Sequence, residues 1–149
     1  MYKSTKTYGH SVGLSCCFRQ HSAESHCKLL HGYALSIKFV FTAKELDKRN
    51  WVVDFGGLKG LKSMLEDTFD HKLLVAKDDP QLGLLLSLNE AGVADVVVVD
   101  KTGCEAFAEL IYKVTEQWLF DAGFAPRCGI ESVEVSEHGA NSALYCSEV

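Results

Sequence analysis

Large apolar residues alternate with small or polar ones along residues 31–42. The odd positions, from His31 to Phe41, carry large side chains, and the even positions carry small or polar ones. Since successive side chains of a strand point to opposite faces, this pattern predicts a long strand with one buried face. Shorter segments of similar character are also predicted as strands: 11–18, 130–137 and 142–147. The last two are separated by a turn and predict a closing hairpin.

Two long segments repeat their apolar residues every three or four positions. The first predicts a helix over about 56–69, with Asp54 as its N-cap. The second predicts a helix from Thr102 to about residue 122, where Thr102 and Glu105 have the spacing of a capping box. Four strands with two long helices favour an α+β sandwich, with both helices on one face of an antiparallel sheet.

A shorter helix and strand are predicted between the two long helices. Asp79-Pro80 predicts a helix start, because proline suits the first helical position, and Gly92 suits the C-terminal end. The run of valines within 94–100 predicts a short buried strand. No Gly-x-Gly-x-x-Gly motif follows a strand, which argues against a Rossmann fold.

Length and composition indicate a single globular domain over residues 1–149. The chain is 47% hydrophobic with a net charge of −5, which excludes a disordered chain and argues against a nucleic-acid partner. No apolar run is long enough to span a membrane, and the first residues do not have the pattern of a secretory signal. Six irregularly spaced cysteines predict reduced thiols and a cytoplasmic protein.

Polar chemistry is concentrated in residues 21–31, which hold His21, His26, Cys27 and His31. Zn²⁺ favours histidine nitrogen and cysteine sulfur, so a loop leading into a strand could fold these groups onto one metal centre. Alternatively, the histidines are ordinary surface residues. Cys27 has two interpretations of its own, a buried small hydrophobe or an activated base.

Three further carboxylates are candidates for function. Asp70 precedes His71, and an aspartate bonded to a histidine ring orients it and stabilises its charged form, although a histidine at a helix end also favours the helix dipole. Glu137 shares a strand face with apolar residues and could be satisfied by two parallel N–H donors of a ligand, or by solvent at the strand end. Glu105 is either a helix-capping residue or a ligand contact.

Five segments, taken together, resemble the 6-pyruvoyltetrahydropterin and 6-carboxytetrahydropterin synthase family. They occur in the family's order: Cys27-Lys-Leu-Leu-His31-Gly-Tyr33, Val53-Asp54-Phe55-Gly-Gly-Leu58-Lys59, Phe69-Asp70-His71-Lys-Leu-Leu, Glu105-Ala-Phe-Ala and Val133-Glu-Val-Ser-Glu137. The three-residue gap between Cys27 and His31 resembles the carboxytetrahydropterin branch more than the pyruvoyl branch.

The resemblance implies a tunnelling fold (T-fold), a four-stranded antiparallel sheet with two helices on one face. Relative to short members, residues 79–100 look like a helix-strand insertion. Members of the family assemble as trimers that stack into hexamers, with sites at subunit interfaces, so a homo-oligomer is implied.

The implied substrate is 7,8-dihydroneopterin triphosphate, converted to 6-carboxytetrahydropterin with loss of triphosphate and acetaldehyde on the way to queuosine. In that reading Cys27 is the general base, and Asp70 with His71 relays protons. Glu137 holds the pterin ring, Glu105 is a weaker candidate for the same pocket, and Zn²⁺ polarises side-chain oxygens.

The sequence departs from the family's pattern at the metal site, where the family uses three histidines. His31 matches one of them and His21 is the best match for an early one, but Tyr33 stands where the third is expected. His26 could supply it from the loop, or Tyr33 could ligate the metal or hold a water. Two other functions therefore stay open: a 6-pyruvoyl-type triphosphate elimination, and a metal-poor pterin-binding protein without turnover.

Overall fold

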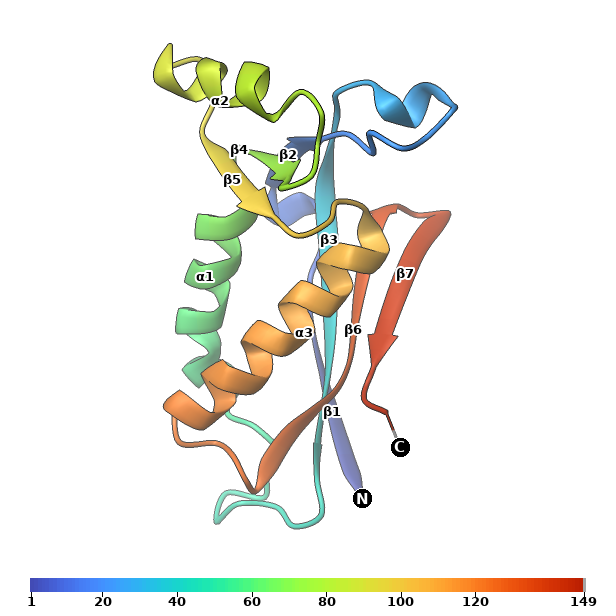
Figure 1. Cartoon of the computed structure of the whole chain (residues 1–149). Helices are drawn as coiled ribbons and strands as arrows, with labels where there is room; N and C mark the ends of the chain where they lie inside the picture. The colour runs from blue at the N-terminus through green and yellow to red at the C-terminus, as the bar shows by residue number, and fades with distance from the viewer. Residues whose placement is uncertain (149) are drawn as a thin grey trace.

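The computed structural model describes residues 1–148 and shows a curled sheet with helices on one face (Figure 1). Six strands follow each other in the order β5-β4-β2-β3-β6-β7, and β1 also pairs with β3. The pairs β2–β4 and β4–β5 are parallel and the others antiparallel. The strands are β1 Tyr2–Tyr8, β2 Leu14–Phe18, β3 His31–Ala43, β4 Lys72–Ala76, β5 Val96–Val99, β6 Cys128–His138 and β7 Asn141–Cys146.

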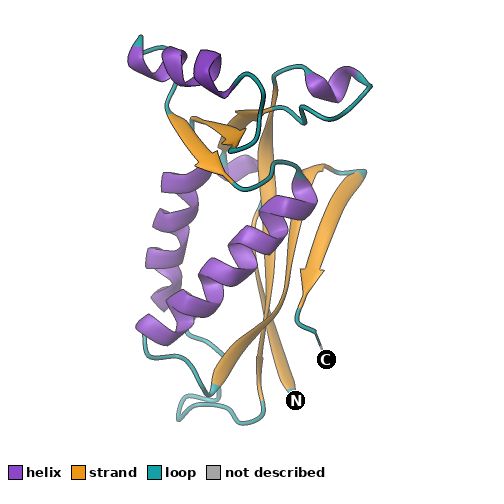
Figure 2. Ribbon diagram, in the orientation of Figure 1, coloured by secondary structure: helices purple, strands orange, loops and turns teal. Residues whose placement is uncertain are grey.

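Strand β3 is the centre of the fold, as its alternation predicts. Leu35, Ile37, Phe39 and Phe41 are fully buried on one face. Helices α1 (Lys59–Phe69) and α3 (Cys104–Asp121) cover that face and complete one core with it (Figure 2). Burial of this apolar face, more than helix propensity, holds both helices in place.

The predicted four-stranded antiparallel sheet was wrong in its extent. Strand β1 was missed because it is an edge strand whose side chains are mostly polar and exposed. Strand β4 was missed because it is a short apolar run directly after α1, and it pairs in parallel with β2. The helix and strand predicted between the two long helices are confirmed as α2 (Leu82–Glu90) and β5, and β5 extends the sheet beyond β4.

The capping box predicted at Thr102 and Glu105 does not form. Gly103 is the N-cap of α3 with a φ of 111°, and no side chain caps it. The Thr102 hydroxyl instead donates to the backbone oxygen of Arg19 at 2.6 Å. Asp54 does cap, but it caps a 3-10 turn, Phe55–Leu58, that leads into α1.

Among the described residues, no helix has the length and apolar character needed to cross a bilayer. All six cysteines are free, as the sequence predicted.

Candidate functional site

A polar cluster forms where β3, β6 and α3 meet. Tyr33 comes from the start of β3, Glu137 from the end of β6, and Cys104 is the first residue of α3. The Tyr33 phenol and the Cys104 thiol both lie near the Glu137 carboxylate, close enough for its charge to raise the pKa of each group, and Cys27 also lies near Tyr33. Three elements distant in sequence therefore converge on one carboxylate.

The environment keeps both partners of Glu137 protonated at neutral pH. Burial raises the pKa of the Cys104 thiol to about 12, and the charge of Glu137 adds to this effect. Burial also raises the pKa of the Tyr33 phenol, again with a contribution from the charge of Glu137. Since each group keeps its proton, each remains a hydrogen-bond donor toward the carboxylate.

A β-bulge sets the position of Glu137. The register of β6 with β7 runs regularly to Ser136 and Ser142 and then shifts before His138 pairs with Asn141. A bulge redirects a side chain relative to regular pleating, and such irregularities are common beside active sites. Val133 and Val135 of β6 are fully buried, whereas Glu137 is half-buried at the mouth of the core.

Three rings pack together beside this cluster. Phe18 is paired with His31 across β2 and β3, and their ring centres are 5.0 Å apart. Tyr33 lies 5.4 Å from His31 and 6.1 Å from Phe18. Gly32 makes this packing possible, because a Cβ there would lie 2.8 Å from the backbone oxygen of Cys16.

The proton position on His31 follows from its neighbour. Its Nδ1 lies 2.7 Å from the backbone oxygen of Leu29, so in the neutral ring Nδ1 carries the proton and donates it. Nε2 is then the acceptor, free to take a proton or to bind an electrophile.

The predicted pairing of Asp70 with His71 is present in the structure. The distance from His71 Nδ1 to Asp70 Oδ1 is 2.7 Å. His71 has a φ of 58°, and this left-handed conformation lets adjacent side chains turn toward each other. The His71 amide also donates to the backbone oxygen of Ser15. The His71 side chain is 86% exposed, so its Nε2 side is accessible.

Asp70 and His71 do not join the Glu137 cluster within one chain. His71 lines a hollow of about 390 Å³ with residues of β2, β4 and the α2–β5 connection. The Glu137 cluster is instead formed by residues of β3, β6 and α3. One chain therefore carries two separate groups of candidate residues.

Comparison with known proteins now adds to this geometry. The sequence profile of the family described as 6-pyruvoyl tetrahydropterin synthase matches residues 10–148. The chain belongs to this family. The resemblance drawn from the five sequence motifs is thereby confirmed.

Curated relatives carry the name of the carboxy branch. The 6-carboxy-5,6,7,8-tetrahydropterin synthase of Rickettsia conorii is 34% identical over 61 residues, which cover 40% of this chain and 44% of that protein. This match thus spans less than half the length of the curated relative. The synthase of the same name from Aquifex aeolicus is 24% identical over 99% of this chain and 90% of its own length.

Solved structures show the same fold. An uncharacterised protein from Wolinella succinogenes matches with a TM-score of 0.81 at 20% identity, over 99% of this chain and 98% of its own. The 6-pyruvoyltetrahydropterin synthase of Plasmodium vivax matches with a TM-score of 0.65 at 13% identity, over the full length of both chains. At these identities the matches establish the α+β fold of the family and carry no activity across.

The three histidines predicted as zinc ligands do not come together. His21 Nε2 lies 3.2 Å from Asp78 Oδ1, and its Nδ1 lies 3.3 Å from the Ser22 hydroxyl. His26 is exposed in a 3-10 turn, His26–Lys28. Across residues 1–148, no three histidine, cysteine, aspartate or glutamate side chains are arranged to hold a metal. The side chains around His31 are those of Phe18 and Tyr33, so this donor set does not fit a zinc ion.

Cys27 and Glu105 keep their candidate roles as predictions. Cys27 is half-buried in the turn, with its backbone oxygen accepting from the Gln20 amide at 2.9 Å. Glu105 is exposed in the first turn of α3, where its charge favours the helix N-terminus and reaches Cys104.

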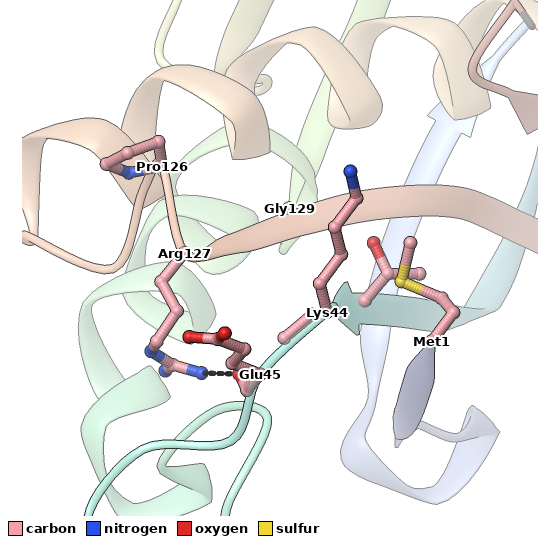
Figure 3. A pocket seen from close by; sticks show the side chains of 8 residues that line it. Met1, Lys44, Glu45, Pro126, Arg127 and Gly129 are labelled. Carbon is pink, nitrogen blue, oxygen red and sulfur yellow. Dashed lines mark hydrogen bonds between the residues drawn. The ribbon is translucent and has the colours of Figure 1, made fainter.

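A larger hollow lies away from these residues, at the opposite end of β3 (Figure 3). It measures about 640 Å³ and is lined by Lys44, Glu45 and Arg127, among others. The Arg127 guanidinium donates to the backbone oxygens of Glu45, Trp51 and Val52. Its donors therefore anchor a loop.

Sequence reasoning missed Phe18 and Cys104 as members of the site. Phe18 ends the predicted strand 11–18 and Cys104 lies at the predicted start of the helix from Thr102, and neither residue type signals function in those places. The pairing of Phe18 with His31 becomes visible only once the register of β2 on β3 is known.

Proposed function

We propose that this chain binds a reduced pterin, 7,8-dihydroneopterin triphosphate, and converts it to 6-carboxytetrahydropterin with loss of triphosphate and acetaldehyde. The observation that carries the proposal is the Glu137 carboxylate, held at a bulge with protonated donors on two sides. Family membership and the names of the curated relatives support the substrate class and the carbon–carbon lyase reaction.

Glu137 is suited to recognise the edge of a pterin ring. A carboxylate can accept two parallel N–H bonds from the ring nitrogen and the amino group, in the geometry of a bidentate pair. Tyr33 and Cys104 lie near the carboxylate and keep their protons at neutral pH, so both can donate to it and hold it in place before ligand arrives. A preorganised acceptor loses little conformational entropy on binding, which favours affinity.

Cys27 and the Asp70–His71 pair are the proposed proton-transfer groups. Cys27 lies near Tyr33, and we propose that it faces the side chain of a pterin held by Glu137. Asp70 holds His71 through Nδ1, leaving Nε2 to take or give a proton. The family resemblance places such sites between subunits, so we propose that His71 of one copy serves the Glu137 cluster of another in a homo-oligomer.

The proposal is tested by incubating purified protein with 7,8-dihydroneopterin triphosphate and identifying products by mass spectrometry. The expected products are 6-carboxytetrahydropterin and acetaldehyde. A mass corresponding to 6-pyruvoyltetrahydropterin would instead assign the chain to triphosphate elimination alone.

Two variants locate the pterin anchor. Glu137→Gln replaces one acceptor oxygen by a donor, so pterin affinity should fall by about 10- to 100-fold. Glu116→Gln, at an exposed glutamate further along α3, is the matched control and should change affinity by less than about threefold. Equal losses in the two variants would contradict the anchoring role of Glu137.

A second function is favoured by one specific observation, the aromatic surroundings of His31. A chain with this site could bind a pterin without turning it over. Tight binding of 7,8-dihydroneopterin triphosphate, with intact ligand recovered after prolonged incubation, would support this function. Activity that is lost in Cys27→Ala would rule it out.

A further inference from the structure

The rings of Phe18, His31 and Tyr33 are spaced like the ligands of a metal site. A zinc-bound imidazole has its ring centre about 3.2 Å from the ion, because the Zn–N bond is about 2.1 Å and the centre lies about 1.1 Å beyond the nitrogen. Three such rings at tetrahedral angles would have centres about 5.2 Å apart. The observed separations are 5.0 Å for Phe18–His31, 5.4 Å for His31–Tyr33 and 6.1 Å for Phe18–Tyr33.

The chemistry of two of these rings is wrong for a metal. Phe18 has no lone pair to donate, and its ring is fully buried against Phe107 at 5.1 Å. Tyr33 offers only a phenol oxygen at the far end of its ring, and the phenol keeps its proton near Glu137. His31 alone retains a nitrogen donor, with Nδ1 held by Leu29 and Nε2 free.

We propose that this chain holds its pterin without a zinc ion, the rings of Phe18 and Tyr33 standing in the places of two of three imidazole ligands. In this arrangement the aromatic rings of Phe18 and Tyr33 flank His31, and the nearby end of the ligand packs against these rings. That the ligand is a pterin rests on the proposed function. The absence of a zinc site is a property of the free protein and is tested separately.

The first test measures zinc bound to the purified wild-type chain after incubation with excess zinc and gel filtration. We expect less than about 0.1 zinc per chain by elemental analysis, because one imidazole does not form a stable site. Retention of about one zinc per chain, lost in His31→Ala, would overturn the proposal.

The second test rebuilds the site with F18H/Y33H. This variant should retain about one zinc per chain and bind zinc at least about 100-fold more tightly than the wild type. Cobalt(II) in place of zinc should give the visible absorption of a four-coordinate ion. Adding His31→Ala should abolish binding, whereas adding His21→Ala should leave it unchanged. A well-folded F18H/Y33H that binds no metal would show that the rings do not occupy ligand positions.

Phe18 is buried, so the double variant could fail to fold. In that case the single variant Tyr33→His is used in place of the double variant, because Tyr33 is only half-buried. Two neighbouring imidazoles should bind cobalt at least about 10-fold more tightly than the wild type, and an unchanged affinity would count against the proposal.

Pterin binding is measured in parallel, with and without a chelator. Equal affinity in both conditions supports a zinc-free site, and loss of binding on chelation would overturn it. A chain that binds neither zinc nor pterin would contradict the proposed function while leaving the metal result standing.

Discussion

Replacing Gly32 by alanine should destabilise the protein through one close contact between strands. Gly32 lies between His31 and Tyr33 on β3 and is paired with Cys17 of β2. A Cβ at this position would be 2.8 Å from the backbone oxygen of Cys16, whereas ordinary contacts begin near 3.4 Å. The obstacle is backbone, which cannot rotate away like a side chain.

The size of the effect follows from this distance. Relief of the overlap requires β2 and β3 to separate locally by about 0.6 Å, against a normal spacing of about 4.8 Å. Overpacking of this kind costs about 1–3 kcal/mol. For a chain of this length, about 2 kcal/mol corresponds to a fall in Tm of roughly 4–8 °C.

The assay is urea unfolding of wild type and Gly32→Ala at one fixed protein concentration, since association would shift the midpoint. Gly83→Ala is the matched control. Gly83 is exposed in α2 with nothing within 4 Å of its Cβ position, so alanine there should stabilise by about 0.5 kcal/mol. If Gly32→Ala were as stable as wild type, the strand contact would not be restrictive and the argument would be refuted.

Other expected outcomes concern an ion pair, a thiol and a core ring. Arg19 lowers the pKa of Asp79, whose side chain is only 1% exposed, so the pair stabilises the fold above about pH 4 and loses this effect as pH falls through the folded pKa. Arg19→Met should cost about 3 kcal/mol at pH 7 and clearly less at pH 3, measured by urea unfolding. At pH 8, iodoacetamide should leave Cys104 unmodified in the folded protein, because its pKa is about 12; labelling as rapid as in urea would contradict this. Phe107→Ala should cost about 3–5 kcal/mol, because Phe107 is fully buried, and a loss below about 1 kcal/mol would be incompatible with that burial.

The sequence was informative wherever local pattern decides structure. The alternation of 31–42 gave β3 almost to the residue, and the valine run at 94–100 contained β5. Asp70 beside His71 was a sound hypothesis, and the geometry that unites them comes from a left-handed residue at a helix end. In each case short-range physical chemistry is sufficient.

The sequence was uninformative where pairing partners decide structure. β1 and β4 depend on neighbours far along the chain for their hydrogen bonds. The three histidines proposed as zinc ligands form no metal-binding group among the described residues for the same reason, because their grouping was inferred from closeness along a loop. His21 lies against Asp78 and His26 is exposed in a 3-10 turn, whereas the register of β2 pairs Phe18 with His31.

Anchoring of the ligand and binding of a metal are separable in this fold, because different strands control them. Glu137 is positioned by a bulge on β6, with donors from β3 and α3. The ring positions are set by the register of β2 against β3, with Phe18 turned into the core. A phenylalanine at this point adds apolar contact with Phe107, whereas a histidine there would have to bury a polar ring unless a metal satisfied it. Exchanging imidazoles for aromatic carbon rings can therefore remove the metal without disturbing the carboxylate, and the Glu137 anchor does not require zinc for its geometry.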